Sequence, residues 1–467
     1  MSRFRDIALR KLANLGPRYL PFADAATEEL PLGRLLRLSL FQVTVGMALV
    51  LLVGTLNRVM IVELAVPATI VGVMVSLPLV FAPFRALIGF KSDIHTSALG
   101  WRRVPYIWKG TLLQFGGFAI MPFALLVLSG FAEAHDAPAW IGISGAALAF
   151  LLVGAGAHMV QTVGLALATD LAPPEDQPKV VGLMYVMMLL GMGASALVFG
   201  WLLDPYTPAR LVQVIQGAAV VTAALNILAL WKQEARDRKR AMTPTVKPDF
   251  NESWRDFVRG IGTRTRLVAI GLGTTGFGMA DVILEPFGGQ VLDMTVSGTT
   301  KLTAALAAGG LVGFALASKV LTNGYSPLRL ARIGAVAGIP GFVAIIMAAP
   351  MDSLALLVAG TTLTGFGAGL FGHGTLTETM RAAPKQHIGL ALGAWGAVQA
   401  TCAGVAVTIG GAIRDIILAM PISAEYGAAT PYYPVFAIEI VLLILALAVM
   451  QPLISRGIAV AGRQPAE

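Results

Sequence analysis

Long apolar runs follow one another along almost the whole of this 467-residue chain. An α-helix needs about 20 mainly apolar residues to cross ~30 Å of hydrocarbon, and each run is long enough to span it. Two runs, 267–292 and 426–455, are interrupted only by acidic side chains. The others hold no charged residue and cover 38–57, 64–84, 110–132, 137–169, 180–203, 211–231, 302–318, 333–351, 353–377 and 388–413. The pattern predicts twelve membrane-spanning helices.

The composition indicates an integral membrane protein and excludes a soluble one. Hydrophobic residues make up 56% of the chain and charged residues only 13%, so a soluble fold would lack polar surface. The single cysteine, Cys402, lies within an apolar run, and one cysteine cannot form an intrachain disulfide. In lipid, every ionisable side chain inside a span is a candidate for function.

The basic residues predict the orientation of the chain. Most of the 34 Lys and Arg residues precede the first span, fall in even-numbered connections or follow the last span. Both termini are therefore expected in the cytoplasm, and the net charge of +8 reflects topology rather than a nucleic-acid partner. Arg85 lies inside the second span, and we expect its charge to snorkel to the cytoplasmic surface without needing a ligand.

One long polar segment, 232–266, divides the spans into six and six. The basic cytoplasmic side that it belongs to is expected to lie close to the lipid bilayer surface. The predicted organisation is a cytoplasmic N-terminal segment, a six-helix bundle, a cytoplasmic linker, a second six-helix bundle and a cytoplasmic tail, at 1–34, 35–231, 232–266, 267–455 and 456–467.

The connection after the second span has a distinctive pattern. It contains Gly89 and, four residues on, Asp93, followed by Gly100 and the pair Arg102 and Arg103. This resembles the loop signature of the major facilitator superfamily. Glycine permits a tight exit from a helix, while the aspartate and arginines can pair across helix ends. The resemblance implies the superfamily fold, an all-α integral membrane protein of twelve transmembrane helices in two six-helix halves.

More specific stretches narrow the family. The segments LNRVMIVEL (56–64), PFRALIG (83–89), GLALATD (164–170) and DVILEPF (281–287) are similar to those of the PucC/LhaA family, also called the bacteriochlorophyll delivery family. The resemblance runs from about residue 30 to about residue 455. PFRALIGFKSD and the N-terminal RYLPFAD are closer to LhaA, the core-antenna member, than to PucC, the peripheral-antenna member.

The resemblance implies a light-harvesting antenna assembly factor of a phototrophic bacterium. Such a protein binds or delivers bacteriochlorophyll while the core antenna polypeptides are inserted and assembled. Its expected partners are antenna polypeptides. Contacts with pigment-synthesis or reaction-centre components and the formation of a homo-oligomer stay open. Its expected location is the bacterial inner (intracytoplasmic) membrane.

Two histidines within spans are candidate pigment ligands. A neutral imidazole can bind the magnesium of a bacteriochlorophyll when a small neighbour leaves room for the macrocycle. His158 and His373 each have a glycine four residues earlier, Gly154 and Gly369, on the same helix face. The alternatives are a hydrogen-bonded interhelical histidine at 158, a polar cluster with Glu378 at 373, and glycines that serve helix packing.

The remaining polar groups within spans form a candidate buried network. Asp281 and Glu285 lie four residues apart on one helix face, next to Pro286. They could couple proton movement, contact a polar group of the pigment, or pair with a basic residue such as Arg58. The other candidate members are Glu63, Gln161 and Glu378.

No pattern in the chain indicates an enzyme. The segment GLGTTG (271–276) fits a nucleotide-binding glycine pattern, but no strand precedes it. Besides pigment-dependent antenna assembly, two functions stay open: proton-coupled transport of a small solute, and pigment-free assistance to antenna helices. Because the spans hold few polar groups at mid-depth, the sequence favours a large apolar ligand.

Overall fold

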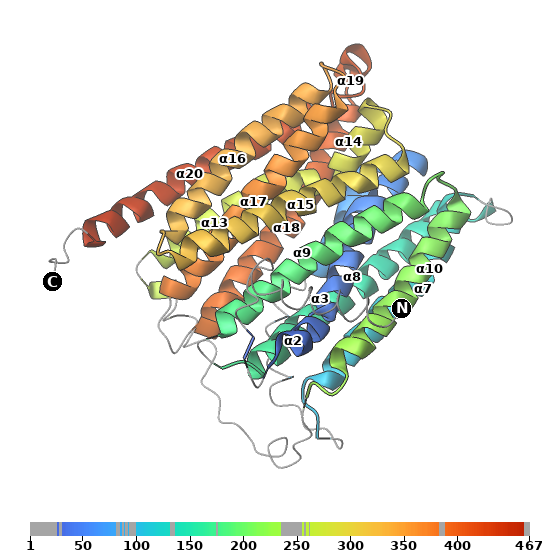
Figure 1. Cartoon of the computed structure of the whole chain (residues 1–467). Helices are drawn as coiled ribbons and strands as arrows, with labels where there is room; N and C mark the ends of the chain where they lie inside the picture. Colours follow the sequence, from blue (N-terminus) through green and yellow to red (C-terminus); the bar gives the residue numbers. More distant parts are fainter. Residues whose placement is uncertain are drawn as a thin grey trace, which may run out of the picture.

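In this computed structural model the chain is a bundle of long helices (Figure 1). The structure describes residues 26–27, 30–80, 85, 88, 92, 100–130, 136–173, 176–234, 255, 258–260, 262–382 and 388–461. In these ranges every regular element is helical. A helix satisfies its backbone hydrogen bonds internally, which lipid requires of any spanning segment. The all-α prediction is confirmed.

The first half begins with one span that changes its helix type. It consists of α2 (Leu32–Leu38), α3 (Leu40–Leu49), the π-helical η2 (Val50–Thr55), α4 (Leu56–Arg58) and the π-helical η3 (Val59–Glu63). The half continues with α5 (Ala68–Val80), α7 (Val104–Leu128), α8 (Ala139–Asp170), α9 (Gln177–Leu202) and α10 (Pro208–Leu230).

The second half also begins with an interrupted span. It consists of α13 (Thr263–Gly278), the 3₁₀ turn η5 (Met279–Val282) and α14 (Leu284–Val291). The half continues with α15 (Val296–Thr322), α16 (Pro327–Ala348), α17 (Leu354–Ala382), α18 (Ile388–Leu418), the short α19 (Pro421–Tyr426) and α20 (Tyr433–Ala461).

The helices match the twelve predicted spans. Among the described residues, 11 helices are long and apolar enough to cross a membrane, and the shorter apolar helix at Ala68–Leu79 takes the place of the second span. Helices α10 and α13 end and begin on either side of the predicted linker, at Leu230 and Thr263. The first span begins at Leu32, slightly before the boundary that the charge pattern suggests. The domain boundaries themselves stay a prediction.

In each half, the third and fourth spans approach each other through facing glycines. A Cβ added at Gly156 of α8 would lie 2.5 Å from the carbonyl oxygen of Gly110 of α7. In the second half, a Cβ at Gly334 of α16 would lie 2.5 Å from the carbonyl oxygen of Gly367 of α17. These are the third and fourth spans of each half. The two halves therefore repeat one close backbone contact that only glycine permits.

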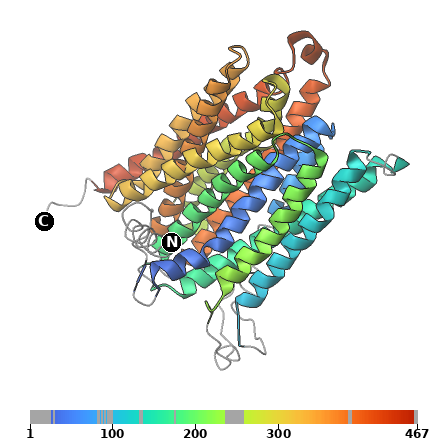
Figure 2. The same cartoon turned by 45° about the vertical axis from the view of Figure 1, so that its right-hand side comes forward.

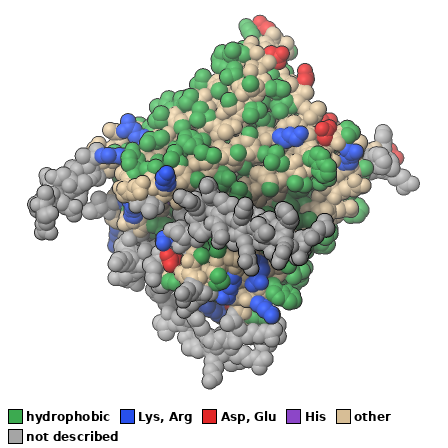
Figure 3. Space-filling view, in the orientation of Figure 1, with side chains coloured by type: hydrophobic (Ala, Val, Ile, Leu, Met, Phe, Trp, Pro, Cys, Tyr) green, Lys and Arg blue, Asp and Glu red, His purple; other side chains and the backbone are tan. Residues whose placement is uncertain are grey.

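The two halves lie side by side, the first coloured blue to green and the second yellow to red (Figures 1 and 2). Helix α9 packs against α15, and α5 packs against α18. The π-helical part of the first span also contacts α15 and η5. Hydrophobic side chains cover much of the visible surface, and the charged ones form small separate groups among them (Figure 3).

The bundle has two end faces. We call the end where α10 stops at Leu230 and α13 starts at Thr263 the linker face. The other end, with the connections at 64–67, 203–207 and 292–295, is the opposite face. That the linker face is cytoplasmic stays a prediction.

Candidate functional site

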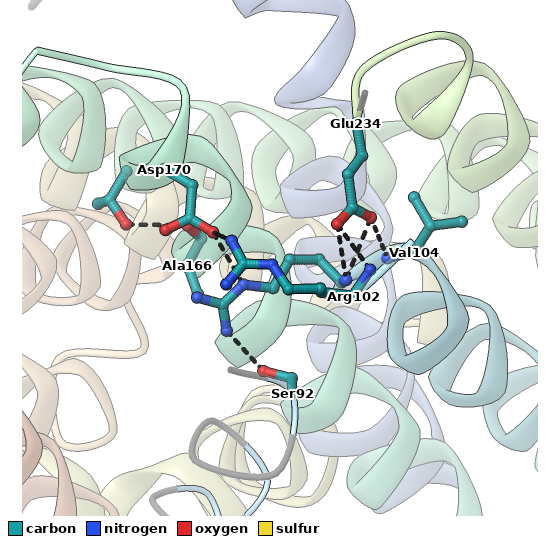
Figure 4. Close-up of polar contacts among 8 residues, drawn as sticks. Ser92, Arg102, Val104, Ala166, Asp170 and Glu234 are labelled. Carbon is teal, nitrogen blue, oxygen red and sulfur yellow. Dashed lines mark hydrogen bonds and ion pairs between the residues drawn. The ribbon is translucent and has the colours of Figure 1, made fainter. Parts of the chain in front are cut away.

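A cluster of charged residues holds the start of α7 at the linker face (Figure 4). The Nε of Arg103 donates to the carboxylate of Asp170, at the end of α8, over 3.0 Å. One of its terminal nitrogens, Nη1, donates to the hydroxyl of Ser92 over 2.6 Å. Arg102 contributes a longer ion pair to Asp170, at 3.6 Å. The paired arginines therefore fasten α7 to α8.

Glu234 caps the same helix. Its carboxylate accepts backbone N–H groups of Arg102, Arg103 and Val104, at 2.8, 3.1 and 2.9 Å. The first N–H groups of a helix have no partner within it, and a carboxylate there also meets the positive end of the helix dipole. Glu234 follows α10, so this cap ties the sixth span to the third.

Of the predicted loop signature, Gly100 and the two arginines lie within the described residues, while Gly89 and Asp93 do not. Gly100 has φ of 79°, in the left-handed region that favours glycine, and it turns the chain into α7. The contacts of Arg102 and Arg103 described above all lie within the first half.

A second polar group lies toward the opposite face. Arg58 forms an ion pair with Glu63 and donates to the carbonyl oxygen of Met294 over 3.3 Å. Near it, burial raises the pKa of Tyr206 above its ordinary value, Glu63 raises it further, and Arg58 opposes the shift. Arg58 thus forms its ion pair within its own span and contacts the second half through the backbone carbonyl of Met294.

The two predicted acidic residues of the seventh span make different contacts. Glu285 is 3% exposed and accepts a hydrogen bond from the hydroxyl of Thr303. Asp281 is half-buried, and its backbone carbonyl accepts from the side chain of Asn57 over 3.0 Å. The described hydrogen bonds and ion pairs thus bring neither carboxylate onto Arg58.

Glu439 of α20, which the sequence reasoning did not select, caps the break in the seventh span. It is fully buried, and its carboxylate accepts the backbone N–H of Ala280 over 2.7 Å. The 3₁₀ turn frees backbone N–H groups that a continuous helix would satisfy. Its signal in the sequence was visible, because Glu439 is the only charge in its apolar run.

The two candidate pigment ligands lie in different surroundings. His158 is half-buried on α8, on the face that also carries Gln161 and Thr162 three and four residues later. His373 is 8% exposed, and its ring lies against Phe314 of α15 with the centroids 4.2 Å apart. Glu378 pairs instead with Arg266 of α13, at 3.6 Å.

The glycines beside both histidines serve helix packing in this structure. A Cβ at Gly154 would lie 2.2 Å from the ring of Pro78 on α5. A Cβ at Gly369 would lie 2.6 Å from the carbonyl oxygen of Gly310 on α15. Neither glycine face is open to a macrocycle in this packing. Any pigment at these histidines must approach from another side of the ring.

Arg85 is the functional candidate that the sequence reasoning misread. Its Nη2 donates to Gln161 over 2.7 Å and its Nε to Thr162 over 2.9 Å. Pro78 of α5 lies against Gly154 of α8, and these hydrogen bonds place the Arg85 guanidinium beside Gln161, seven residues further along α8. The side chain reaches across to α8 instead of snorkelling to the surface.

A row of contacts connects this group to the second half. Gln161 donates to the sulfur of Met188 on α9 over 3.2 Å and contacts Gln42 of the first span at 3.5 Å. Tyr185, one turn before Met188, stacks on Phe314 with the centroids 6.3 Å apart. Since Phe314 also contacts His373, the row crosses from α8 through α9 and α15 to α17. We call these residues the inter-half row.

Comparison with known proteins decides the family. Residues 55–458 match the family model described as PUCC protein. The chain belongs to the PUCC family. It is 62% identical to Protein PucC of Cereibacter sphaeroides, over 98% of this chain and 99% of that one. It is 65% identical to Protein PucC of Rhodovulum sulfidophilum, over 92% of this chain and 96% of that one.

A more distant relative of this PUCC-family chain has a different name. The Bacteriochlorophyll synthase 44.5 kDa chain of Rhodobacter capsulatus is 28% identical, over 84% of this chain and 90% of that one.

Solved structures show the fold alone. A bacterial homolog of the human lysosomal transporter Spinster, in an inward-facing conformation, superposes with a TM-score of 0.64 at 15% identity, over 92% and 96% of the two chains. A nucleoside transporter superposes with a TM-score of 0.65 at 14% identity, over 89% and 99%. The predicted major facilitator fold is confirmed.

Proposed function

We propose that this member of the PUCC family is an assembly factor for light-harvesting antennae that binds bacteriochlorophyll as its cargo. Its strong identity to proteins named PucC supports a role in the photosynthetic membrane, and the relative named for bacteriochlorophyll synthase supports a pigment-related one. In this proposal the protein resides in the bacterial inner membrane with both termini in the cytoplasm.

The observation that carries the proposal is the inter-half row. It runs from Gln161 on α8, whose helix face also carries the half-buried His158, to the buried His373 on the other half, with Tyr185 and Phe314 between them. Aromatic rings and few charges suit a large conjugated ligand better than a small polar solute. A bound pigment would supply a magnesium ion with one free axial position for an imidazole.

His158 fits the ligand role better than His373. His158 is half-buried as a residue and has no ring packed against it in the described contacts, whereas His373 is packed against Phe314 and its helix contacts Gly310 through Gly369. A macrocycle at His373 would have to displace the phenyl ring. We therefore assign the primary pigment contact to His158 and leave His373 as a second candidate.

The proposal has two versions, which differ in the antenna that the protein helps to assemble. The stretches that resemble LhaA suggest the core antenna. The identity of 62–65% to proteins named PucC favours the peripheral antenna instead, because the family resemblance assigns that client to PucC. A deletion strain distinguishes them through the near-infrared bands of the two antennae. Loss of the core band alone supports the first version, and loss of the peripheral band alone supports the second.

Pigment binding is tested with protein purified from a pigmented host. The wild type should carry a near-infrared absorbance band, and His158→Ala should lose most of it while His373→Ala keeps it. The two variants control for each other, since each removes one imidazole from a span. Protein without pigment would contradict the proposal and favour a pigment-free assembly role, and retention of the band in both variants would remove His158 as the ligand.

Proton-coupled transport is the second candidate. It is favoured by Asp281, a half-buried carboxylate beside the break in the seventh span. If it operates, reconstituted vesicles should show proton uptake driven by a solute gradient, and Asp281→Asn should abolish it. Solute-independent proton flux in both proteins would exclude it.

A further inference from the structure

Arg85 differs from the arginines of the helix bundle that pair with carboxylates. These pairs are Arg58 with Glu63, Arg102 and Arg103 with Asp170, Arg266 with Glu378, and Arg414 with Asp415. Within the described part of the chain, Arg85 has only neutral hydrogen-bond partners, the Gln161 amide and the Thr162 hydroxyl. Its charge is not balanced by a carboxylate there.

The position of this charge makes the imbalance costly. Gln161 lies nine residues before Asp170, so the guanidinium is held about 13 Å along α8 from its linker-face end. Cations at such a depth usually pair with an anion, line a ligand pathway or snorkel outward. The two bonds to α8 exclude snorkelling in this structure. An anion from outside the chain would complete the site.

The surroundings indicate what kind of anion fits. His158 lies on the same face of α8 as both partners of Arg85, and Tyr185 is one turn from Met188, which contacts Gln161. A ligand here meets a cation on one side and aromatic or apolar side chains on the other. This suits an amphiphile with a flat apolar body and one carboxylate. Guanidinium binds a carboxylate through two parallel, charge-assisted hydrogen bonds.

We propose that Arg85 is the anion-binding residue of the cargo site and recognises a free carboxylate on a tetrapyrrole. This rests on the proposed function and narrows it. Bacteriochlorophyll carries its propionate as an ester of a long alcohol, so a free acid means a macrocycle that has not yet been esterified or has lost its alcohol. The favoured cargo is therefore the acid form.

The test compares two ligands that differ only in that group. Purified protein in a neutral detergent is titrated with the bacteriochlorophyll macrocycle as its free propionic acid and as the methyl ester, and absorbance shifts give both dissociation constants. A hydrogen bond to a charged group contributes more binding free energy than a hydrogen bond between neutral groups. The wild type should therefore bind the acid about tenfold more tightly than the methyl ester.

Two variants should abolish the preference for the acid over the ester in different ways. Arg85→Gln removes the cation, and Gln161→Glu places a carboxylate at the atom that Arg85 already contacts, so each should bind acid and ester equally. Gln161→Glu keeps Arg85 and carries the test if Arg85→Gln does not fold. Arg332→Gln, at an exposed position of α16, is the control and should keep the tenfold preference.

The outcomes separate this inference from the proposed function. Equal binding of acid and ester by the wild type, or an unchanged preference in both variants, overturns the role of Arg85 and leaves pigment binding intact. Binding of neither form overturns the proposed function. If an anionic phospholipid binds in an Arg85-dependent way while acid and ester bind equally, the anion is a lipid headgroup, and the tetrapyrrole assignment fails.

Discussion

At the scale of single residues, the linker-face cluster shows how one carboxylate can hold two helices. Glu234 accepts three backbone N–H groups at the start of α7, and no charged side chain is needed for that contact. The sequence does not reveal this contact, because the partners lie about 130 positions apart. A glutamate that follows a span also resembles any other charged residue of a connection between spans.

Glu234→Ala should destabilise the first half. Losing a helix cap costs about 0.5–2 kcal/mol, and this carboxylate serves three donors, so the upper part of that range is expected. The measurement is thermal unfolding of the purified protein in detergent. Glu425→Ala, which removes an exposed carboxylate on α19, is the control and should leave the midpoint unchanged. An unaltered midpoint in Glu234→Ala would show that water replaces the cap.

Arg103 should be less tolerant of lysine than Arg102. It donates through Nε to Asp170 and through Nη1 to Ser92, and a lysine ammonium cannot reproduce this planar fork. Arg103→Lys should therefore lower the unfolding temperature, while Arg102→Lys should have a smaller effect because its ion pair is 3.6 Å long and half-exposed. Equal shifts in the two variants would contradict this ranking.

At the scale of helices, the apolar runs were enough to predict the spans, because length and hydropathy decide what can cross lipid. They could not predict the depth of Arg85. That depth follows from its hydrogen bonds to Gln161 and Thr162 of α8, which hydropathy does not reveal. The glycine spacing around the histidines has two interpretations for the same reason: a small residue makes room, but only the fold decides whether a helix or a ligand uses the space.

The glycine crossings give a sharp prediction for α7. In Gly110→Ala the new Cβ would lie 2.9 Å from a backbone carbonyl oxygen of α8, and overpacking of this kind costs about 1–3 kcal/mol. Gly116→Ala is the matched control on the same helix, because a Cβ there meets nothing within 4 Å. Thermal unfolding should separate the two variants. Equal stability would mean that α7 and α8 can move apart without loss.

At the scale of the whole molecule, the described residues show several polar contacts between the halves near the opposite face. Among them are Thr55 with Thr300 at 3.2 Å and Thr69 with Asp415 at 2.6 Å. Ser76 and Thr408 add another at 2.9 Å. At the linker face, the contacts described for Arg103, Glu234 and Glu378 each stay within one half.

A disulfide across the halves tests this arrangement. The Cβ positions of Gly193 on α9 and Ala307 on α15 lie 3.7 Å apart, which matches disulfide geometry. In a Cys402→Ser background, Gly193→Cys with Ala307→Cys should cross-link on oxidation. After cleavage at a protease site inserted between 235 and 254, the halves should stay joined until reduced. Gly193→Cys alone is the control, and separation of the oxidised double variant would refute the contact.

The described contacts between the halves have a consequence for how a membrane ligand would reach the proposed pigment site. If the contacts near the opposite face hold, the halves would separate first at the linker face, and Arg85 is held about 13 Å along α8 from that face. A pigment entering there would come from the lipid layer next to the linker face and could return to it, so its delivery would need no passage across the bilayer midplane.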